Sequence, residues 1–238
     1  MHDVKDKIRN HSSAIDLFKA EPPVQGTHES LGAFAYRALR DAIRAGRIPP
    51  GPHIRELEVA QWLQISRTPV REAFHRIISE GLLTTGPWNG VKVAEPTPKQ
   101  LVGLYAVRET LEGTAAALSA KNATAAEVRS LFGIAATESK EYDDPVKLVV
   151  INAKLHQAIY RAAHNQFLLQ SLTTIVDTLG LLRHSTFVLP GSIELARREH
   201  LQLIRAIRGG EARRAEMLAR RHVRHALAMR LQLQKRKA

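Results

Sequence analysis

Apolar side chains recur every three or four positions along most of this 238-residue chain, and Gly, Pro and polar residues divide the pattern into segments. Spacing of this kind predicts amphipathic helices. Three such segments come first, at 31–43, 57–63 and 70–78. Two short runs follow, at 82–85 and 91–93, on either side of a turn that contains Gly and Pro, and they predict a β-hairpin. Because helix, helix-turn-helix and hairpin is the order of a winged helix, we expect that fold in this part of the chain.

Beyond Pro96 every segment of the chain shows the helical pattern. We expect six helices, divided by capping and breaking residues such as Thr124, Asp144 and Gly209. Their expected ranges are 98–120, 125–140, 145–163, 166–184, 193–208 and 211–234. Consecutive amphipathic helices bury their apolar faces against one another in a bundle. The predicted fold class is therefore mainly α, with an N-terminal winged helix-turn-helix of three helices and a β-hairpin wing, followed by an all-α helical-bundle effector domain.

The expected domain boundaries follow from composition and breaker residues. Residues 1–28 are polar and lack sustained periodicity, which predicts a flexible N-terminal tail. The winged helix-turn-helix is expected at 29–95 and a hinge at 96–98, where Pro residues interrupt the pattern. The all-helical domain, expected to bind a ligand and to dimerise, then occupies 99–238.

The net charge of +12 favours polyanionic partners, because clustered Lys and Arg release counterions from phosphates. Residues 197–238 carry 13 basic and 3 acidic side chains, whereas residues 1–95 carry 13 and 11. A solvated basic helix face explains this excess as well as a functional patch does, so charge is not our main argument for DNA binding. Cys is absent, and neither a signal peptide nor a membrane-spanning stretch is evident, so we expect a cytoplasmic protein that is nucleoid-associated when bound to DNA.

The second helix of a helix-turn-helix lays its N-terminal residues against base edges in the major groove, and a wing approaches the adjacent backbone or minor groove. The candidate DNA-binding residues are Ser66, Arg67, Thr68, Arg71, Asn89, Gly90 and Lys92. We expect Thr68 to cap the helix. Arg67 and Arg71 are four positions apart on one helix face, where their N–H groups suit guanine O6 and N7. The alternatives are solvated surface arginines, or a winged helix that contacts protein instead of DNA.

Four of the expected bundle helices turn polar residues toward the core. These residues are Arg108, Asn152, His156, His200 and His222. A single core histidine is usually hydrogen-bonded within the protein, but three imidazoles on separate helices are a common way to hold a divalent metal. A buried guanidinium needs an anion, so Arg108 predicts either a bound carboxylate ligand or an internal pair with Glu112. The apolar stripe expected around it is Leu101, Leu104, Leu111, Ala115 and Leu118.

The stretch from Leu31 to Val93 resembles the DNA-binding domain of the GntR family of bacterial transcriptional regulators. The matching residues are Pro50-Gly51, Ser66-Arg67-Thr68-Pro69-Val70-Arg71-Glu72-Ala73 and Glu80-Gly81-Leu82. The run that begins at Ser66 is highly specific. The resemblance implies dimers on short palindromic operators, which agrees with the two-fold symmetry of helix-turn-helix binding in general.

Residues 98 to about 232 resemble the FCD ligand-binding domain of the FadR subfamily. The matching pieces are Arg108-Glu109-Thr110-Leu111-Glu112, Asn152-Ala153-Lys154-Leu155-His156, Glu199-His200 and Met217 to His222. That family commonly binds a divalent metal through an Asp and three His, and the metal helps to hold a small organic acid. The resemblance therefore implies that His156, His200 and His222 bind zinc, nickel or manganese together with Asn152, and that Arg108 joins them in effector binding. Asn152 stands where the family usually has Asp, and its neutral amide is a weaker ligand than a carboxylate.

These features predict a ligand-responsive transcriptional regulator, with a repressor favoured, and no enzyme. It would bind operator DNA as a homodimer and change its affinity when a small carboxylate binds. One alternative is a metal-dependent hydrolase that activates water on three His; it lacks a His-Glu-x-x-His motif and an unclaimed inward carboxylate to act as a base. Another is a structural chromosome-associated protein, whose core would not need Arg108 and three imidazoles.

Overall fold

The computed structural model describes residues 21–44, 47–48, 51–86, 90–140, 144–180 and 185–235. The chain divides into two compact units. Unit 1 lies within Met1–Glu95, and the main part of unit 2 lies within Pro96–Val176 and His184–Ala238. No helix among the described residues is both long enough and apolar enough to cross a membrane.

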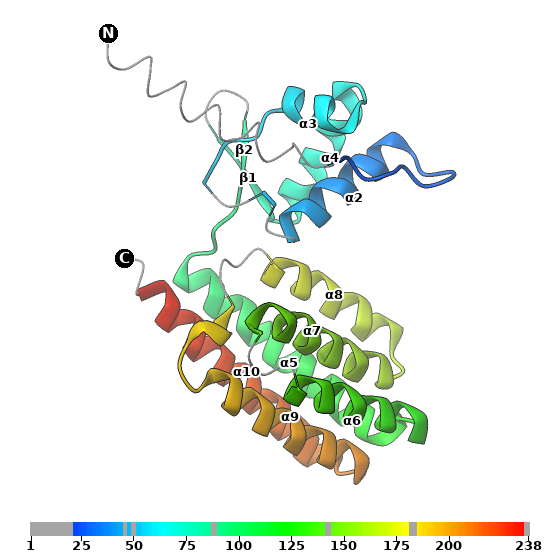
Figure 1. The fold of residues 1–238 in the computed structure, drawn as a ribbon, viewed down its shortest axis with the longest axis vertical. Helices are drawn as coiled ribbons and strands as arrows, with labels where there is room; N and C mark the ends of the chain where they lie inside the picture. Colours follow the sequence, from blue (N-terminus) through cyan, green and yellow to red (C-terminus); the bar gives the residue numbers. More distant parts are fainter. Residues whose placement is uncertain are drawn as a thin grey trace. The chain divides into compact units, whose positions relative to one another are not determined.

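Unit 1 is a winged helix, as its sequence predicts (Figure 1). The helices are α2 (Leu31–Arg44), α3 (Glu56–Leu63) and α4 (Arg67–Ser79). The strands β1 (Leu83–Thr85) and β2 (Val91–Val93) pair antiparallel and form the wing. One apolar core joins these helices and strands, and α2 packs along α4 at its centre. The N-terminal end of α4 is thereby held on a rigid support.

The turn between α3 and α4 sets where the second helix of the motif begins. Gln64 ends α3 in the left-handed conformation, with φ 55°. Ser66 has extended backbone and is the N-cap of α4, so the expectation that Thr68 caps this helix is wrong. The helix starts earlier because Pro69 is tolerated anywhere in the first turn, where its missing N–H leaves no bond unmade. Arg67 is therefore already helical.

Unit 2 is a bundle of six helices and one short 3-10 helix within the described residues. They are α5 (Pro98–Asn122), α6 (Ala125–Lys140), α7 (Pro145–Ala162), α8 (Gln166–Gly180), η2 (Thr186–Val188), α9 (Ser192–Arg208) and α10 (Ala212–Lys235). The Thr97 hydroxyl accepts the Gln100 N–H at the start of α5, and Thr124 does the same for Glu127 before α6. Helices α5 and α10 pack along each other, and α9 lies beside α10 (Figure 1). The mainly α fold class is confirmed.

The buried face of α5 differs from the expected stripe. Tyr105, Arg108 and Glu112 are buried, while Leu104 and Leu111 are half-buried. The reason is that α5 has neighbours on two sides: its polar side chains face the interior of the bundle, and Leu111 packs sideways with residues of α7 and α8 such as Leu172. The expected stripe is therefore confirmed at Leu101, Arg108 and Ala115, which are buried, and the buried face extends beyond it to Tyr105 and Glu112.

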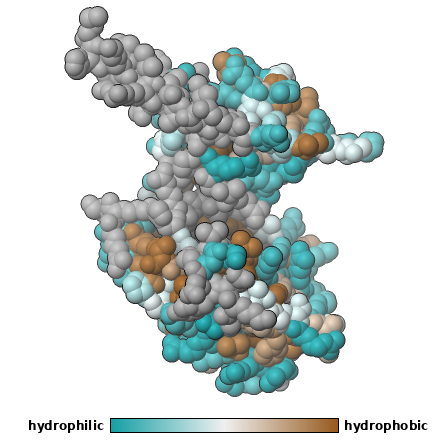
Figure 2. Space-filling model, viewed as in Figure 1, coloured by the Kyte–Doolittle hydropathy of each residue, from teal (hydrophilic) through white to brown (hydrophobic). Residues whose placement is uncertain are grey.

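The N-terminal tail expected at 1–28 is described from residue 21 onward, and residues 1–20 lie outside the described residues. Its last part is tied to α2 by Arg37, which donates to the Glu29 carboxylate at 2.7 Å and to the Val24 carbonyl at 3.1 Å. Figure 2 shows a mostly hydrophilic surface with separate groups of hydrophobic side chains on both units. Exposed apolar residues such as Phe167 are ordinary on protein surfaces.

Candidate functional site

The two arginines predicted to read DNA bases lie at the exposed start of α4. Arg67 and Arg71 have side chains that are 60% and 56% exposed, and Ser66 and Thr68 are exposed beside them. Both arginines bind one carboxylate, that of Glu56 at the start of α3. Arg71 donates from Nε to Oε1 at 2.8 Å and from Nη2 to Oε2 at 3.0 Å, and Arg67 donates from Nη2 to Oε2 at 3.0 Å.

Glu56 was not among the residues expected from the sequence. Its side chain is 17% exposed, and hydrogen bonds from Arg71 and Arg67 lower its pKa against the opposing effect of burial. The pKa of Arg71 is raised by the same bond. A carboxylate at the first position of a helix is also favoured by the helix dipole. The sequence shows that Glu56 lies at the start of the predicted helix. That it contacts the arginines of α4 follows only from the folded turn between the two helices.

The wing gives its three candidate residues different environments. Lys92 is exposed on β2, where it is paired in register with Thr84. Gly90 is buried, and its carbonyl accepts the Gly86 N–H at 2.7 Å. Asn89 lies outside the described residues. The structure therefore gives Gly90 a structural position in the hairpin and leaves Lys92 as the exposed candidate for DNA.

Unit 2 brings together the three predicted histidines. His156 on α7, His200 on α9 and His222 on α10 are all buried, and their possible ligand atoms lie within 4.8 Å of one another. The ring centroids of His200 and His222 are 4.8 Å apart, and that of His156 is 5.5 Å from His200 and 5.2 Å from His222. Side chains from three separate helices thus converge on one point.

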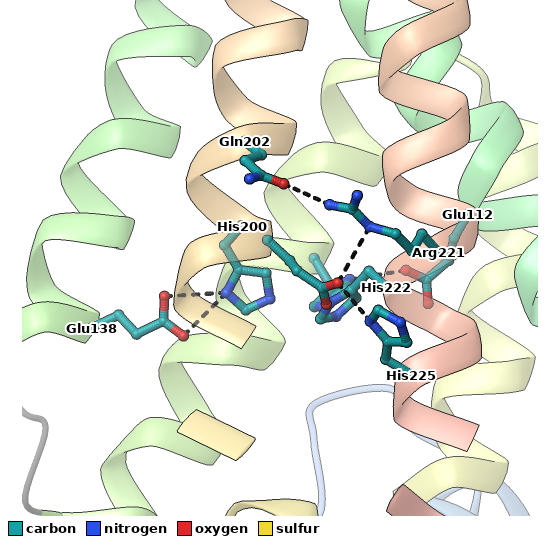
Figure 3. A network of polar contacts seen from close by, with 9 residues as sticks. Glu112, Glu138, His200, Gln202, Arg221, His222 and His225 are labelled. Atoms are coloured by element: carbon teal, nitrogen blue, oxygen red, sulfur yellow. Dashed lines mark hydrogen bonds and ion pairs between the residues drawn. The ribbon is translucent and has the colours of Figure 1, made fainter. Parts of the chain in front are cut away.

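Each of these imidazoles contacts a buried glutamate through Nδ1. His156 faces Glu112 at 3.0 Å, His200 faces Glu138 at 3.1 Å, and His222 faces Glu199 at 2.9 Å. Figure 3 shows Glu138 beside His200. A carboxylate fixes the proton on the nitrogen it contacts and so leaves Nε2 as a free lone pair. All three rings could therefore offer Nε2 to a metal ion while a carboxylate holds Nδ1.

The free nitrogens fit a divalent metal. Nε2 of His156 and Nε2 of His200 are buried and have no hydrogen-bond partner among the described residues. Burial, together with the neighbouring His200 and His156, lowers the pKa of His222 to about 4 although Glu199 opposes that shift. Because His222 is neutral at pH 7, it can donate its lone pair. Asn152 is half-buried one turn before His156 on α7.

Arg108 is engaged inside the protein. Its Nε donates to Glu112 Oε1, and its guanidinium lies 5.2 Å from the ring centre of Tyr105. Burial lowers the pKa of Arg108, but Glu112 more than compensates, so the pKa is raised. Of the two expectations for Arg108, the internal pair is therefore confirmed, and contact with a carboxylate ligand stays a prediction. Glu112 joins this arginine to the histidine cluster.

The three supporting glutamates were missed as a group by the sequence reasoning. Glu112 was considered only as a partner of Arg108, and Glu138 was not considered at all. A faint signal exists, because Glu199 directly precedes His200 and Glu112 lies one turn after Arg108. Glu199 also binds outward: His225 contacts it at 2.7 Å and Arg221 at 3.5 Å (Figure 3). This carboxylate thus links a buried imidazole to the bundle surface.

Two family models match the chain. Residues 31–93 match the family described as bacterial regulatory proteins, gntR family. Residues 103–225 match the FCD domain. The first range contains the winged helix, and the second contains the three histidines and their glutamates.

Curated relatives and solved structures agree with these matches. The chain is 33% identical to the "Probable D-xylose utilization operon transcriptional repressor" of Paenarthrobacter nicotinovorans, over 76% of this chain and 80% of that protein. It is 27% identical to the transcriptional regulator McbR of Escherichia coli, over 74% and 79% of the two chains. The fold is similar to the structure of E. coli McbR/YncC, with a TM-score of 0.73 at 22% identity over 86% of this chain and 98% of that one.

Proposed function

The chain belongs to the gntR family of bacterial regulatory proteins and carries an FCD domain, and on that premise we propose that its histidine cluster holds a divalent metal and takes part in sensing a small carboxylate. The chain is a DNA-binding transcriptional regulator, and its family and relatives are regulators rather than enzymes. The hydrolase alternative has no support from these relatives. The three glutamates near the histidines are not available as a general base for hydrolysis, because each is already bound to an imidazole.

For the DNA-binding function, we propose that the start of α4 enters the major groove. Arg67 and Arg71 would read base edges there, Ser66 and Thr68 would contact phosphates, and the wing with Asn89, Gly90 and Lys92 would approach the neighbouring backbone. The support is the exposure of both arginines at the helix start. Regulators of this family bind operators and usually act as dimers. We infer a palindromic operator, with each protomer contacting one half-site.

The observation that carries the effector proposal is the set of three imidazoles whose Nδ1 atoms are all engaged by glutamates. His156, His200 and His222 would hold the metal through Nε2, and Asn152 would add a neutral oxygen ligand. A bound zinc, nickel or manganese ion supplies open coordination positions to which a carboxylate can bind. Arg108, although paired with Glu112, keeps further N–H groups for the same anion.

The wider role follows from these parts. A small carboxylate bound in unit 2 would change the dimer's affinity for its operator, and we favour repression because the relative from P. nicotinovorans is named a repressor. Duplex DNA as target implies action in the cytoplasm, at the nucleoid. We propose the boundaries 29–95 for the DNA-binding domain, 96–98 for the hinge and 99–238 for the effector and dimerisation domain.

The first experiment is elemental analysis of protein purified without chelator, paired with a thermal-shift screen of small carboxylates and of D-xylose. We expect about one metal per chain, and a higher Tm with one of the acids. His222→Ala should lose the metal, whereas His164→Ala, which removes an exposed imidazole that binds Glu127, should retain it. Wild-type protein that takes up neither zinc, nickel nor manganese on titration would refute the metal centre.

A further inference from the structure

Glu56 binds Arg71 along one defined edge of the guanidinium. The contacts use Nε at 2.8 Å and Nη2 at 3.0 Å, which form the side edge of the group. A guanidinium has five N–H donors in a planar fork, so Nη1 and the second N–H of Nη2 remain on the terminal edge. Two parallel donors on such an edge match O6 and N7 of guanine. Arg71 can therefore bind Glu56 and a guanine at the same time.

We propose that Glu56 is a specificity-determining residue of this regulator that acts without touching DNA, by holding Arg71 and Arg67 in the orientation that reads guanine. The inference rests on the proposed placement of α4 in the major groove. Glu56 is a positioning residue in this role. Neither the family matches nor the relatives assign a role to it.

The different exposures of Glu56 and Arg71 support this positioning role. Glu56 is 17% exposed and begins α3, so it is fixed by the fold. Arg71 is 56% exposed and has no other hydrogen bond or ion pair among the described residues. A long exposed side chain loses much rotational freedom when it must meet one base. Glu56 removes that freedom before DNA arrives, which favours the guanine complex.

The same carboxylate disfavours nonspecific binding. On a nonspecific duplex the arginines would turn to phosphates and leave Glu56, so one ion pair would only replace another. The carboxylate would then lack its partners near a negatively charged backbone, which is a repulsive contribution. Specificity is the difference between the two affinities, and Glu56 acts on both of them. We therefore expect its removal to change the ratio more than it changes nonspecific affinity.

The test uses the full-length protein with two probes. One is a duplex that the wild type selects from a random-sequence library, and the other is poly(dI-dC). Glu56→Gln keeps the side-chain shape and should weaken binding to the selected duplex on the order of tenfold, with unchanged or tighter binding to poly(dI-dC). Asp41→Asn removes the same charge from the exposed face of α2 and should leave the ratio of affinities unchanged.

A double-mutant cycle separates orientation from charge. If Glu56 acts through Arg71, Glu56→Gln should weaken binding to the selected duplex much less in the Arg71→Ala background than in the wild type, because only Arg67 is then left for Glu56 to hold. Arg71→Lys keeps the charge but has no planar edge with which to bind guanine, so it should lose at least as much as Glu56→Gln does. Circular dichroism melts check that each variant is folded, and Glu56→Ala carries the test if Glu56→Gln does not fold.

The outcomes distinguish the two proposals. Independent, multiplying losses from Glu56→Gln and Arg71→Ala would overturn the positioning role. An equal loss of Glu56→Gln on both probes would overturn it as well. If Arg71→Ala leaves preference for the selected duplex unchanged, the placement of α4 in the groove is refuted, and the role of Glu56 falls with it.

Discussion

Both units of this regulator use a glutamate to orient a nitrogen-bearing side chain, but at opposite levels of burial. In unit 1, Glu56 holds arginines that are 60% and 56% exposed. In unit 2, Glu112, Glu138 and Glu199 hold imidazoles that are at most 9% exposed. Exposed ion pairs add little stability because water solvates the separated groups, whereas removing one partner of a buried pair leaves a charge without solvent. The same kind of contact would therefore serve DNA recognition at the surface and stability in the core.

The largest effect that would sharpen this contrast is expected at Glu112. Glu112→Ala leaves Arg108 as a buried charge without its main partner and also frees His156 Nδ1. We expect the free energy of unfolding to fall by about 3–5 kcal/mol in urea titrations. The matched control is Glu109→Ala. Glu109 lies on α5, like Glu112, but its partner Arg224 is exposed, so the free energy of unfolding should fall by less than about 1 kcal/mol. Equal losses of unfolding free energy in Glu112→Ala and Glu109→Ala would contradict the contrast between buried and exposed ion pairs.

The next effect concerns metal affinity at the supporting glutamates. Glu138→Gln keeps the size of a side chain that contacts His200 but removes its charge. We expect zinc affinity, measured by competition with a chromophoric chelator, to fall about 10–100-fold. Glu127→Gln, whose partner His164 is exposed, should leave the affinity unchanged. An undiminished zinc affinity in Glu138→Gln would show that burial of the carboxylate does not contribute to the site.

The pH dependence of stability gives a third comparison. The pKa of His222 is lowered to about 4 in the folded chain from 6.5. Its neutral form therefore stabilises the fold fully above about pH 6.5, and this contribution is lost as pH falls toward 4 because the unfolded chain takes up the proton first. For metal-free protein we expect a loss of about 2 kcal/mol between pH 7.5 and pH 5 in urea unfolding.

The matched variant for that measurement is His222→Gln, which cannot titrate. Its loss over the same pH range should be smaller by about the same 2 kcal/mol. His164→Gln, at an exposed position, should behave like the wild type. A His222→Gln variant with the full loss would place the titrating group elsewhere.

The smallest expected effect is on the stability of unit 1. Glu56→Ala breaks contacts to two exposed arginines, and we expect it to lower the free energy of unfolding by less than about 1 kcal/mol. Urea unfolding of the full chain at 150 mM salt is the measurement. A loss comparable to that of Glu112→Ala would break the contrast between the two regions, because it would make Glu56 a structural residue first.

Sequence periodicity predicted the elements of the fold well. The expected range 125–140 coincides with α6, and the other expected bundle helices agree with the structure closely within the described residues. The reason is that breakers such as Pro145 and the pair Gly209-Gly210 act locally. The full width of the buried face of α5 was less predictable, because Leu111 of the expected stripe packs toward α7 and α8 while Glu112, outside that stripe, faces the histidines.

The candidate site was predictable in its histidines but not in its carboxylates. Three imidazoles on core-facing positions stand out because a lone polar group in an apolar stripe needs a reason. Glutamates are common on helices, and nothing local separates Glu138 from an exposed neighbour. The distinction depends on which helix packs against α6, and that information is tertiary. Glu56 was not predictable from the sequence for the same reason, because its partners Arg67 and Arg71 belong to the following helix.

The spacing of the histidine and glutamate partners along the chain has a consequence for how the protein matures. His156 and Glu112 are 44 residues apart, His200 and Glu138 are 62 apart, and His222 and Glu199 are 23 apart. Such distant partners meet only after several helices have docked, and α10 is the last of these helices to leave the ribosome. A nascent chain without α10 has two of the three imidazoles, so a metal held by all three could bind only after α10 has been made and has docked.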